Sequence, residues 1–145
     1  MLRIAGAIVL SYVVMFALVF VTFTLAYLAM GADGAFKPGT YEVSVLWLTA
    51  SIVLGLVAAV AGGYVCAVVG RSAKAPLALA VVVLVIGFGL AFANSDAPDP
   101  DTPQVRDGAV GNFEAMQSAR QPTWLTMVNP VIGAIGVLIG GRLRG

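Results

Sequence analysis

The sequence predicts an all-α integral membrane protein, a four-transmembrane-helix bundle, on the basis of its composition and the placement of its charges. Of its 145 residues, 60% are apolar and only 10% are charged, and the mean hydropathy is +0.98. Soluble domains carry about 25% charged residues. Four stretches contain no charged residue: 4–32, 43–70, 75–95 and 121–141. Each is long enough to cross a bilayer, which takes about 20 apolar residues.

We therefore expect helices at about 4–30, 45–70, 75–93 and 124–141, with outer loops at 31–44 and 94–123, in a single membrane domain over 1–145. Helices are required because lipid offers no partner to free backbone N–H and C=O groups. The strands of a barrel would alternate polar and apolar residues, and these stretches do not. The first stretch follows Arg3, as in a signal peptide. It is nearly twice as long as a signal's apolar region of about 7–15 residues, so we interpret it as a retained helix.

The basic residues predict the orientation. Those at the N-terminus, in the turn after the second helix and at the C-terminus are accompanied by no acid; they are Arg3, Arg71, Lys74, Arg142 and Arg144. All seven acids fall in the two outer loops. The positive-inside rule then places both termini in the cytoplasm. The richness in Ala, Gly and Val favours a bacterial inner membrane, the cytoplasmic membrane.

The chain also shows signs of an internal repeat. Trp-Leu-Thr at 47–49 recurs at 124–126, and the glycine-rich run 55–63 resembles 133–141 in a register one residue longer. Phe-Thr-Leu-Ala-Tyr at 23–27 resembles Phe-Gly-Leu-Ala-Phe at 88–92. We therefore predict two αα-hairpin repeats that insert the same way up, related by a pseudo-two-fold axis along the membrane normal. This differs from the inverted repeats of many transporters.

Two helices carry small or polar residues at matching spacings of four, three and four, which places each set on one helical face. The sets are Ser51, Gly55, Ala58 and Gly62 in the second helix, and Asn129, Gly133, Gly136 and Gly140 in the fourth. Small residues let backbones approach closely in lipid, so we expect these two helices to cross as a packing contact. A glycine-lined pore or ligand groove is the alternative.

Within the fourth helix, Asn129-Pro130 predicts a kink, because proline removes a backbone donor and clashes with the preceding turn. The Asn129 amide then either bonds across helices or forms a polar seam with Ser51 that binds an ion or small solute.

Large side chains mark candidate surfaces for a partner or for lipid. An aromatic stripe in the first helix comprises Tyr12, Phe16, Phe20, Phe23 and Tyr27. In the long outer loop, 112–120 predicts a short helix with Asn112 as its N-cap, and Phe113 and Met116 three residues apart. Loops of this length are often functional, so we take it as the first candidate for a recognition element.

The same loop begins with three carboxylates, Asp96, Asp99 and Asp101, separated by prolines. Carboxylates suit Ca²⁺, but they lack the spacing of an EF-hand loop. We therefore predict no metal site.

The ionisable residues exclude most chemistry. The chain has no His and one Cys, which excludes haem ligation by histidine, disulfide chemistry within the chain and most metal sites. The predicted helices contain no charged residue of the kind that marks proton and ion paths. We predict no catalytic residue, no cofactor and no nucleic-acid partner.

The expected function is a structural or accessory, non-catalytic subunit of a larger membrane protein complex, in contact with the lipid bilayer and with other membrane subunits or a second copy of the chain. The alternatives are a passive channel or carrier for a small solute or lipid, and an outer-surface enzyme that uses loop carboxylates.

Overall fold

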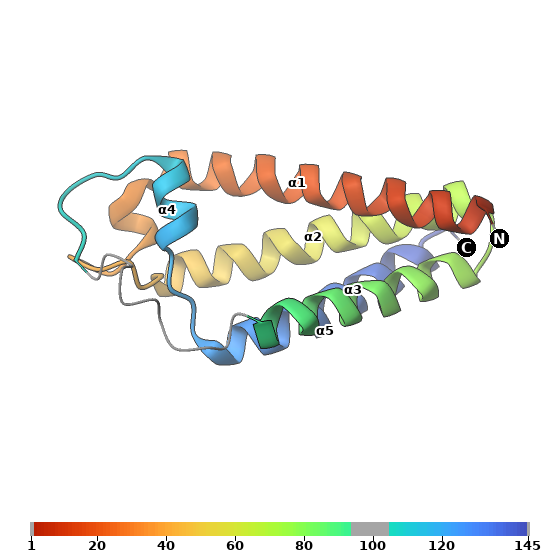
Figure 1. Ribbon diagram of the computed structural model, residues 1–145. Helices are drawn as coiled ribbons and strands as arrows, with labels where there is room; N and C mark the ends of the chain where they lie inside the picture. The colour runs from red at the N-terminus through yellow and green to blue at the C-terminus, as the bar shows by residue number, and fades with distance from the viewer. Residues whose placement is uncertain (1, 94–104, 145) are drawn as a thin grey trace.

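The computed structural model describes residues 2–93 and 105–144. This part of the chain forms five helices: α1 (Leu2–Ala35), α2 (Val45–Gly70), α3 (Lys74–Ala93), α4 (Asn112–Ser118) and α5 (Thr123–Arg142) (Figure 1). All but α4 are long and apolar enough to cross a membrane. The predicted all-helical membrane bundle is confirmed at this level, and the chain is indicated to be an integral membrane protein.

Helix α1 runs five residues further than predicted, so the first outer loop is shorter than 31–44. Gly31 interrupts its regular geometry, with φ 69° and ψ 176°. This region of backbone space is essentially restricted to glycine. The interruption redirects the last turn, and Ala32 and Ala35 become buried at the outer end of the bundle.

Helix α2 is held at both ends. At its start, the Ser44 hydroxyl accepts a hydrogen bond from the Trp47 N–H at 3.0 Å and donates to the Gly34 carbonyl at 2.5 Å. At its end, Arg3 Nε donates to the Val69 carbonyl at 3.1 Å, and Arg144 Nη1 donates to the Ala67 carbonyl. A positively charged side chain is stabilised near the C-terminus of a helix, which carries a partial negative charge. Both chain ends therefore lie at the same end of the bundle as the α2 C-terminus (Figure 1).

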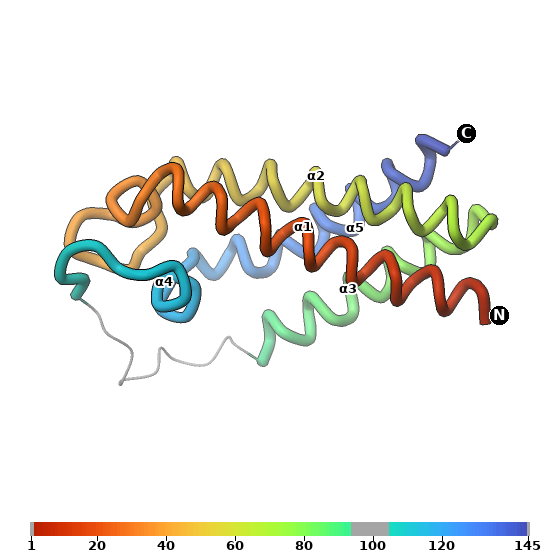
Figure 2. Tube along the Cα trace, turned by 90° about the horizontal axis from the view of Figure 1, so that it is seen from above, coloured from red at the N-terminus to blue at the C-terminus, as the bar shows by residue number. Residues whose placement is uncertain are grey.

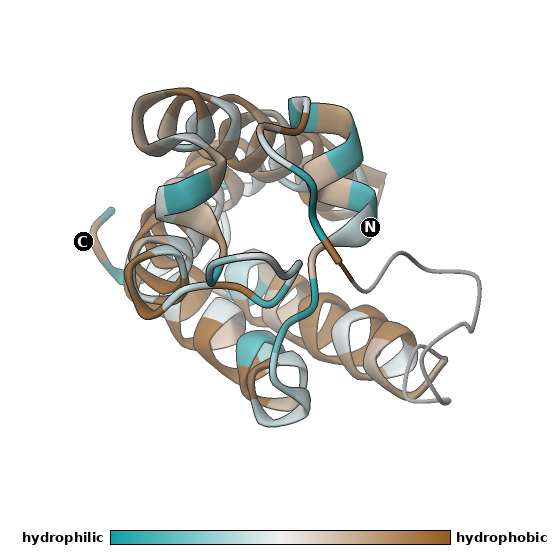
Figure 3. Ribbon diagram, turned by 90° about the vertical axis from the view of Figure 1, so that its left-hand side faces the viewer, coloured by the Kyte–Doolittle hydropathy of each residue, from teal (hydrophilic) through white to brown (hydrophobic). Residues whose placement is uncertain are grey.

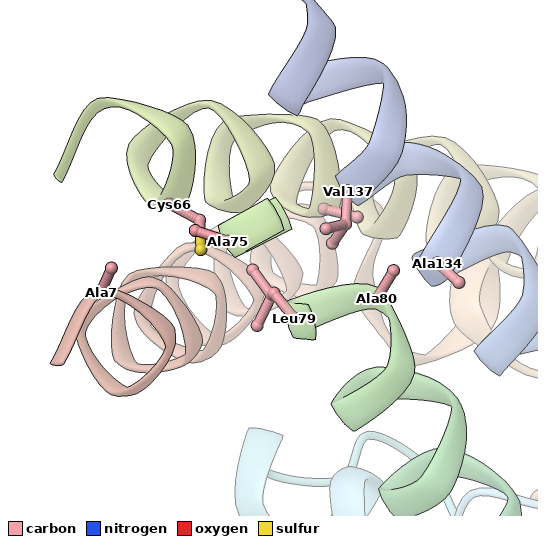
Figure 4. Close-up of a cluster of buried hydrophobic side chains, with 8 residues drawn as sticks. Ala7, Cys66, Ala75, Leu79, Ala80, Ala134 and Val137 are labelled. Carbon is pink, nitrogen blue, oxygen red and sulfur yellow. The ribbon is translucent and has the colours of Figure 1, made fainter. Parts of the chain in front are cut away.

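The inner half of the bundle, near the chain termini, is tightly packed. Small side chains from α1, α2, α3 and α5 meet there around Leu79 and Val137, both fully buried (Figure 4). Such residues allow close backbone approach, which is how helices associate in lipid.

Helices α2 and α5 cross at glycine residues, where their backbones come into close contact. A Cβ on Gly140 would collide with the Val60 carbonyl, and a Cβ on Gly63 would collide with the Val137 carbonyl. Between these contacts, a Cβ on Gly136 would lie 2.7 Å from the Cβ of Ala59. Only glycine permits this approach of two backbones.

The outer half is more open. Helix α1 packs mainly on α2, and α3 packs mainly on α5. No Cα of α1 lies within 8 Å of a Cα of α5 in the described chain. Two orthogonal views show α1 and α3 separating toward the end that carries α4 (Figures 1 and 2).

Candidate functional site

The small residues of α2 and α5 that were predicted to meet at one crossing do not all contact the same helix. On α5, Gly136 and Gly140 face α2, whereas a Cβ on Gly133 would lie 3.2 Å from Val83 of α3. On α2, Gly62 faces Met15 of α1, and the adjacent Gly63 faces α5.

Two other members of the predicted α2 face are not at the crossing. A Cβ on Gly55 would meet nothing within 4 Å, and Ser51 is only partly buried. Ala58, one turn further along, is 2% exposed. The face of α2 toward α5 is therefore Ala59, Val60 and Gly63, because α2 packs against α1 and α5 at once. The adjacent glycines Gly62 and Gly63 are the sequence feature that corresponds to these two contacts, one with α1 and one with α5.

Ser51 and Asn129 line the same cavity. Its volume is about 240 Å³, and it lies between α1, α2 and α5, with Phe23, Gly55 and Gly133 on its wall. The Ser51 hydroxyl donates to the Leu48 carbonyl at 2.9 Å. In contrast, the Asn129 carboxamide is exposed and makes no hydrogen bond with any described residue.

Asn129 also borders a second cavity, of about 300 Å³, on the α3 side of α5. Its neighbour Pro130 is buried and packs against Gly87 of α3, where a Cβ added to Gly87 would lie 2.7 Å from the proline ring. We name the two cavities together the outer groove.

The aromatic stripe of α1 is split in two. Tyr27 is buried, and its hydroxyl donates to the Val110 carbonyl at 2.7 Å, so it is not a free contact for lipid or a partner. Phe23 and Tyr27 pack on Trp47, with ring centroids 5.8 Å and 6.1 Å away. The remaining rings face outward: Phe16 and Phe20 are stacked at 6.5 Å and exposed, and Tyr12 is 37% exposed.

Both outer loops join into one structure, which we name the outer cap: residues 36–44 together with 105–122. Thr40 bridges to Val105, and Glu42 bridges to Arg120. The backbone bonds include Val43 N–H to the Arg120 carbonyl at 3.1 Å and Arg120 N–H to the Tyr41 carbonyl at 2.9 Å. Seen from this end, polar loop residues lie over the apolar helices (Figure 3).

A buried arginine stabilises the outer cap. Arg106 Nη2 lies 2.6 Å from Asp33 Oδ1, and Nη1 donates to the Gly108 carbonyl at 2.7 Å. Only 4% of the Arg106 side chain is exposed, and its Nε has no partner among the described residues. Nothing local in the sequence distinguishes Arg106 from a solvated loop arginine, so its burial is not predictable from the sequence.

Two other polar pairs lie in the outer cap. The Tyr41 hydroxyl donates to Glu114 Oε1 at 2.6 Å, and this bond, with burial and the carboxylate charge, raises the pKa of Tyr41. Lys37 Nζ lies 2.7 Å from Glu42 Oε2 and lowers the pKa of Glu42. The Lys37–Glu42 pair is more than half exposed, whereas Tyr41 as a residue is 3% exposed.

Helix α4 is the helical part of the outer cap and has one face buried. Ala115 and Ser118 are buried, whereas Phe113 is 74% exposed and Met116 is 56% exposed. The predicted helix is present, but its N-cap is Gly111 rather than Asn112. The Asn112 amide instead donates to the Thr24 hydroxyl of α1 at 3.3 Å, which ties α4 to the bundle. Beneath α4 is a cavity of about 200 Å³ lined by Phe23, Tyr27, Phe36 and Trp47.

The loop carboxylates Asp96, Asp99 and Asp101 lie outside the described residues. Within 2–93 and 105–144, no group of three His, Cys, Asp or Glu side chains is placed to hold a metal ion.

No known protein family matches the sequence, and no curated protein or solved structure shows significant similarity to it. Two features of the described residues therefore indicate function: the exposed apolar side chains of α4, and the unpaired amide of Asn129.

Proposed function

We propose that this protein is a structural or accessory, non-catalytic subunit of a larger membrane complex, and that it binds its partner through α4. The observation that carries the proposal is the exposure of Phe113 and Met116 on a helix whose other face is buried in the outer cap. Exposed apolar side chains that cluster on a polar surface mark interaction sites. Aromatic residues and methionine are enriched in interfaces.

The attachment of α4 supports this proposal. Tyr41 bonds to Glu114, Asn112 bonds to Thr24, and Tyr27 bonds to the Val110 carbonyl just before the helix. A surface that is ordered before binding loses less conformational entropy when the partner docks.

The test is affinity capture of the tagged protein, expressed at native level, from mild detergent, with stoichiometric mass spectrometry. We expect one partner protein to co-purify at a fixed stoichiometric ratio. This partner should no longer co-purify with the double variant that combines Phe113→Ser and Met116→Ser. Val105→Ser is the matched control, because Val105 is 69% exposed on the same cap, pairs with Thr40 and is not part of α4. Recovery of the wild-type protein alone, as a monodisperse monomer, would contradict the proposal.

We also infer that both termini are cytoplasmic, in a bacterial inner membrane. The inference rests on Arg3, Arg71 and Arg144 near the inner end, and on the acids of the outer cap. An impermeant maleimide applied to intact cells, in a Cys66→Ala background, should label Thr40→Cys in the outer cap and spare Ser72→Cys in the α2–α3 turn. The reverse pattern would invert the orientation.

A pseudo-two-fold axis between the halves is likewise our proposal, supported by the α2–α5 crossing. The shift that carries Trp47 onto Trp124 also carries Val60 onto Val137 and Gly63 onto Gly140. Under it, the Val60–Gly140 and Val137–Gly63 contacts are equivalent, and Ala59 meets its own counterpart, Gly136. The contacts follow the tryptophan register rather than the glycine register. A co-expressed pair of halves, 1–72 and 73–145, should reassemble; failure to co-purify would count against two self-contained repeats.

A second candidate function, passive carriage of a small solute, is favoured by one observation: Ser51 and Asn129 line a common cavity. In proteoliposomes, Asn129→Ala should change any flux that the wild-type protein supports. Flux equal to that of empty vesicles across a broad solute panel would remove this candidate.

A further inference from the structure

We propose that the outer groove binds one neutral lipid, with a long hydrocarbon tail between α1 and α5 and an uncharged carbonyl or hydroxyl oxygen on the Asn129 amide. This site is separate from the α4 surface and does not depend on the accessory function. It needs only the two cavities that meet at Asn129.

The groove opens sideways to the membrane. Because α1 and α5 have no Cα atoms within 8 Å of each other, the space between them is filled by side chains and cavity rather than by helix packing. The second cavity is lined by residues of α1, α3 and α5, among them Tyr12, Gly87 and Asn129. Neither cavity is lined by Leu79 or Val137, the fully buried residues of the packed core (Figure 4).

Asn129 supplies the polar contact. Thr126, one turn away in the same groove, donates to the Thr123 carbonyl at 2.7 Å, and Ser51 donates to the Leu48 carbonyl. The amide N–H groups of Asn129 have no such partner among the described residues; the Gln121 amide and the Tyr12 hydroxyl also line the two cavities. A polar group without a partner in an apolar environment is costly, so an acceptor is expected there. Asn129 lies six residues into α5, about 9 Å below its first residue at 1.5 Å per residue, which is deeper than a charged headgroup sits comfortably.

The residues that line the groove also indicate that its ligand is uncharged. No acidic or basic side chain of the described chain lines either cavity, so nothing there neutralises an ionic group. Apart from the uncharged polar side chains already named, the wall is formed by aliphatic and aromatic side chains and by glycine. These properties fit a neutral lipid of the diacylglycerol or quinone class, which share a hydrocarbon tail and uncharged oxygen acceptors.

The chain offers a matched pair of variants. A Cβ on Gly55 meets nothing within 4 Å, and Gly55 lines the groove, so Gly55→Leu fills the site without disturbing the helix crossing. A Cβ on Gly89 of α3 also meets nothing within 4 Å, and Gly89 lines neither cavity of the groove. Gly89→Leu is therefore the control. Both variants are first checked for a monodisperse elution profile and a wild-type melting temperature.

The experiment uses the full chain in nanodiscs that contain one of three diazirine probes: a diacylglycerol, a quinone or a phosphatidylcholine. Crosslinked peptides are mapped by mass spectrometry. We expect one neutral probe to label peptides containing Phe23 and Asn129 in the wild type and in Gly89→Leu, and labelling to fall to background in Gly55→Leu. Asn129→Leu should reduce it about fivefold, the effect of losing one hydrogen bond.

The preferred neutral probe identifies the class of lipid. Equal labelling of Gly55→Leu and Gly89→Leu would overturn the proposal. So would preference for phosphatidylcholine, or labelling spread evenly over lipid-facing positions such as Val85 and Ile135.

Discussion

Gly140 of α5 lies directly against the main-chain carbonyl of Val60 on α2, with no room for a Cβ between them. The reciprocal contact, Gly63 against the Val137 carbonyl, lies on the other side of the crossing. Because lipid gives no hydrophobic drive to helix association, this close packing is what holds the two helices together.

Replacing Gly140 with alanine should destabilise the bundle. The added methyl group collides with the Val60 backbone, which has no flexible side chain to move aside. We expect a loss of about 1–3 kcal/mol, the usual cost of overpacking. Thermal unfolding in mild detergent measures it. Gly89→Ala, which enters open space on α3, should leave the melting temperature unchanged; equal melting of the two variants would contradict the crossing.

A second prediction concerns Gly31. Its φ of 69° with ψ of 176° admits glycine and excludes alanine without strain of about 1–3 kcal/mol. Gly31→Ala should therefore straighten α1 and loosen the outer cap, seen as faster hydrogen exchange at Phe36 and Val43. Gly6→Ala, in the regular part of α1 with open space around it, is the control. Unchanged exchange in Gly31→Ala would show that the outer cap does not depend on this break.

Two ion pairs that involve residues of the outer cap, Arg106–Asp33 and Lys37–Glu42, should differ in their contribution to stability. The Arg106 side chain is 4% exposed and holds both Asp33 and the Gly108 carbonyl. Arg106→Met should cost about 2 kcal/mol, since hydrogen bonds of a charged group are lost from a buried position. Lys37→Met breaks a pair that is more than half exposed, and such pairs contribute little. Denaturant or thermal unfolding of the two variants side by side tests this, and a larger effect at Lys37 would refute it.

The outer cap should also respond to alkaline pH. The hydrogen bond to Glu114 and burial favour the neutral Tyr41 phenol, so its pKa is raised in the folded protein. The stabilisation is fully present below the unfolded pKa of about 10 and is lost as pH rises through the folded pKa. The ultraviolet absorbance titration of the wild type minus that of Tyr41→Phe isolates this phenol. Titration of Tyr41 at or below the ordinary value would contradict the bond.

The long helices were predictable because lipid imposes one requirement, an uninterrupted run of about 20 apolar residues, and charge placement marks the ends of each run. The bounds at Val45, Gly70 and Ala93 agree with the prediction. The continuation of α1 past Gly31 was not predictable, because a glycine at this position of the sequence is compatible both with the end of a helix and with a break inside one.

The candidate site was predictable only in part. Spacing placed Ser51 and Asn129 at similar depth, and the structure places both on one cavity. The spacing did not show that α2 serves two neighbours, which moves its contact with α5 to Ala59, Val60 and Gly63. The burial of Arg106 depends on loop–loop pairing between residues far apart in the sequence, which no periodicity encodes.

The outer cap has a consequence for biogenesis. The segment after α1 has its backbone partners almost at the other end of the protein, at Val105, Arg106 and Arg120. During synthesis, residues 36–44 therefore emerge before their backbone partners exist, and the outer cap cannot form until residues 105–120 have been made. A chain that ends before Arg120 would therefore lack the backbone partner of Tyr41 and Val43.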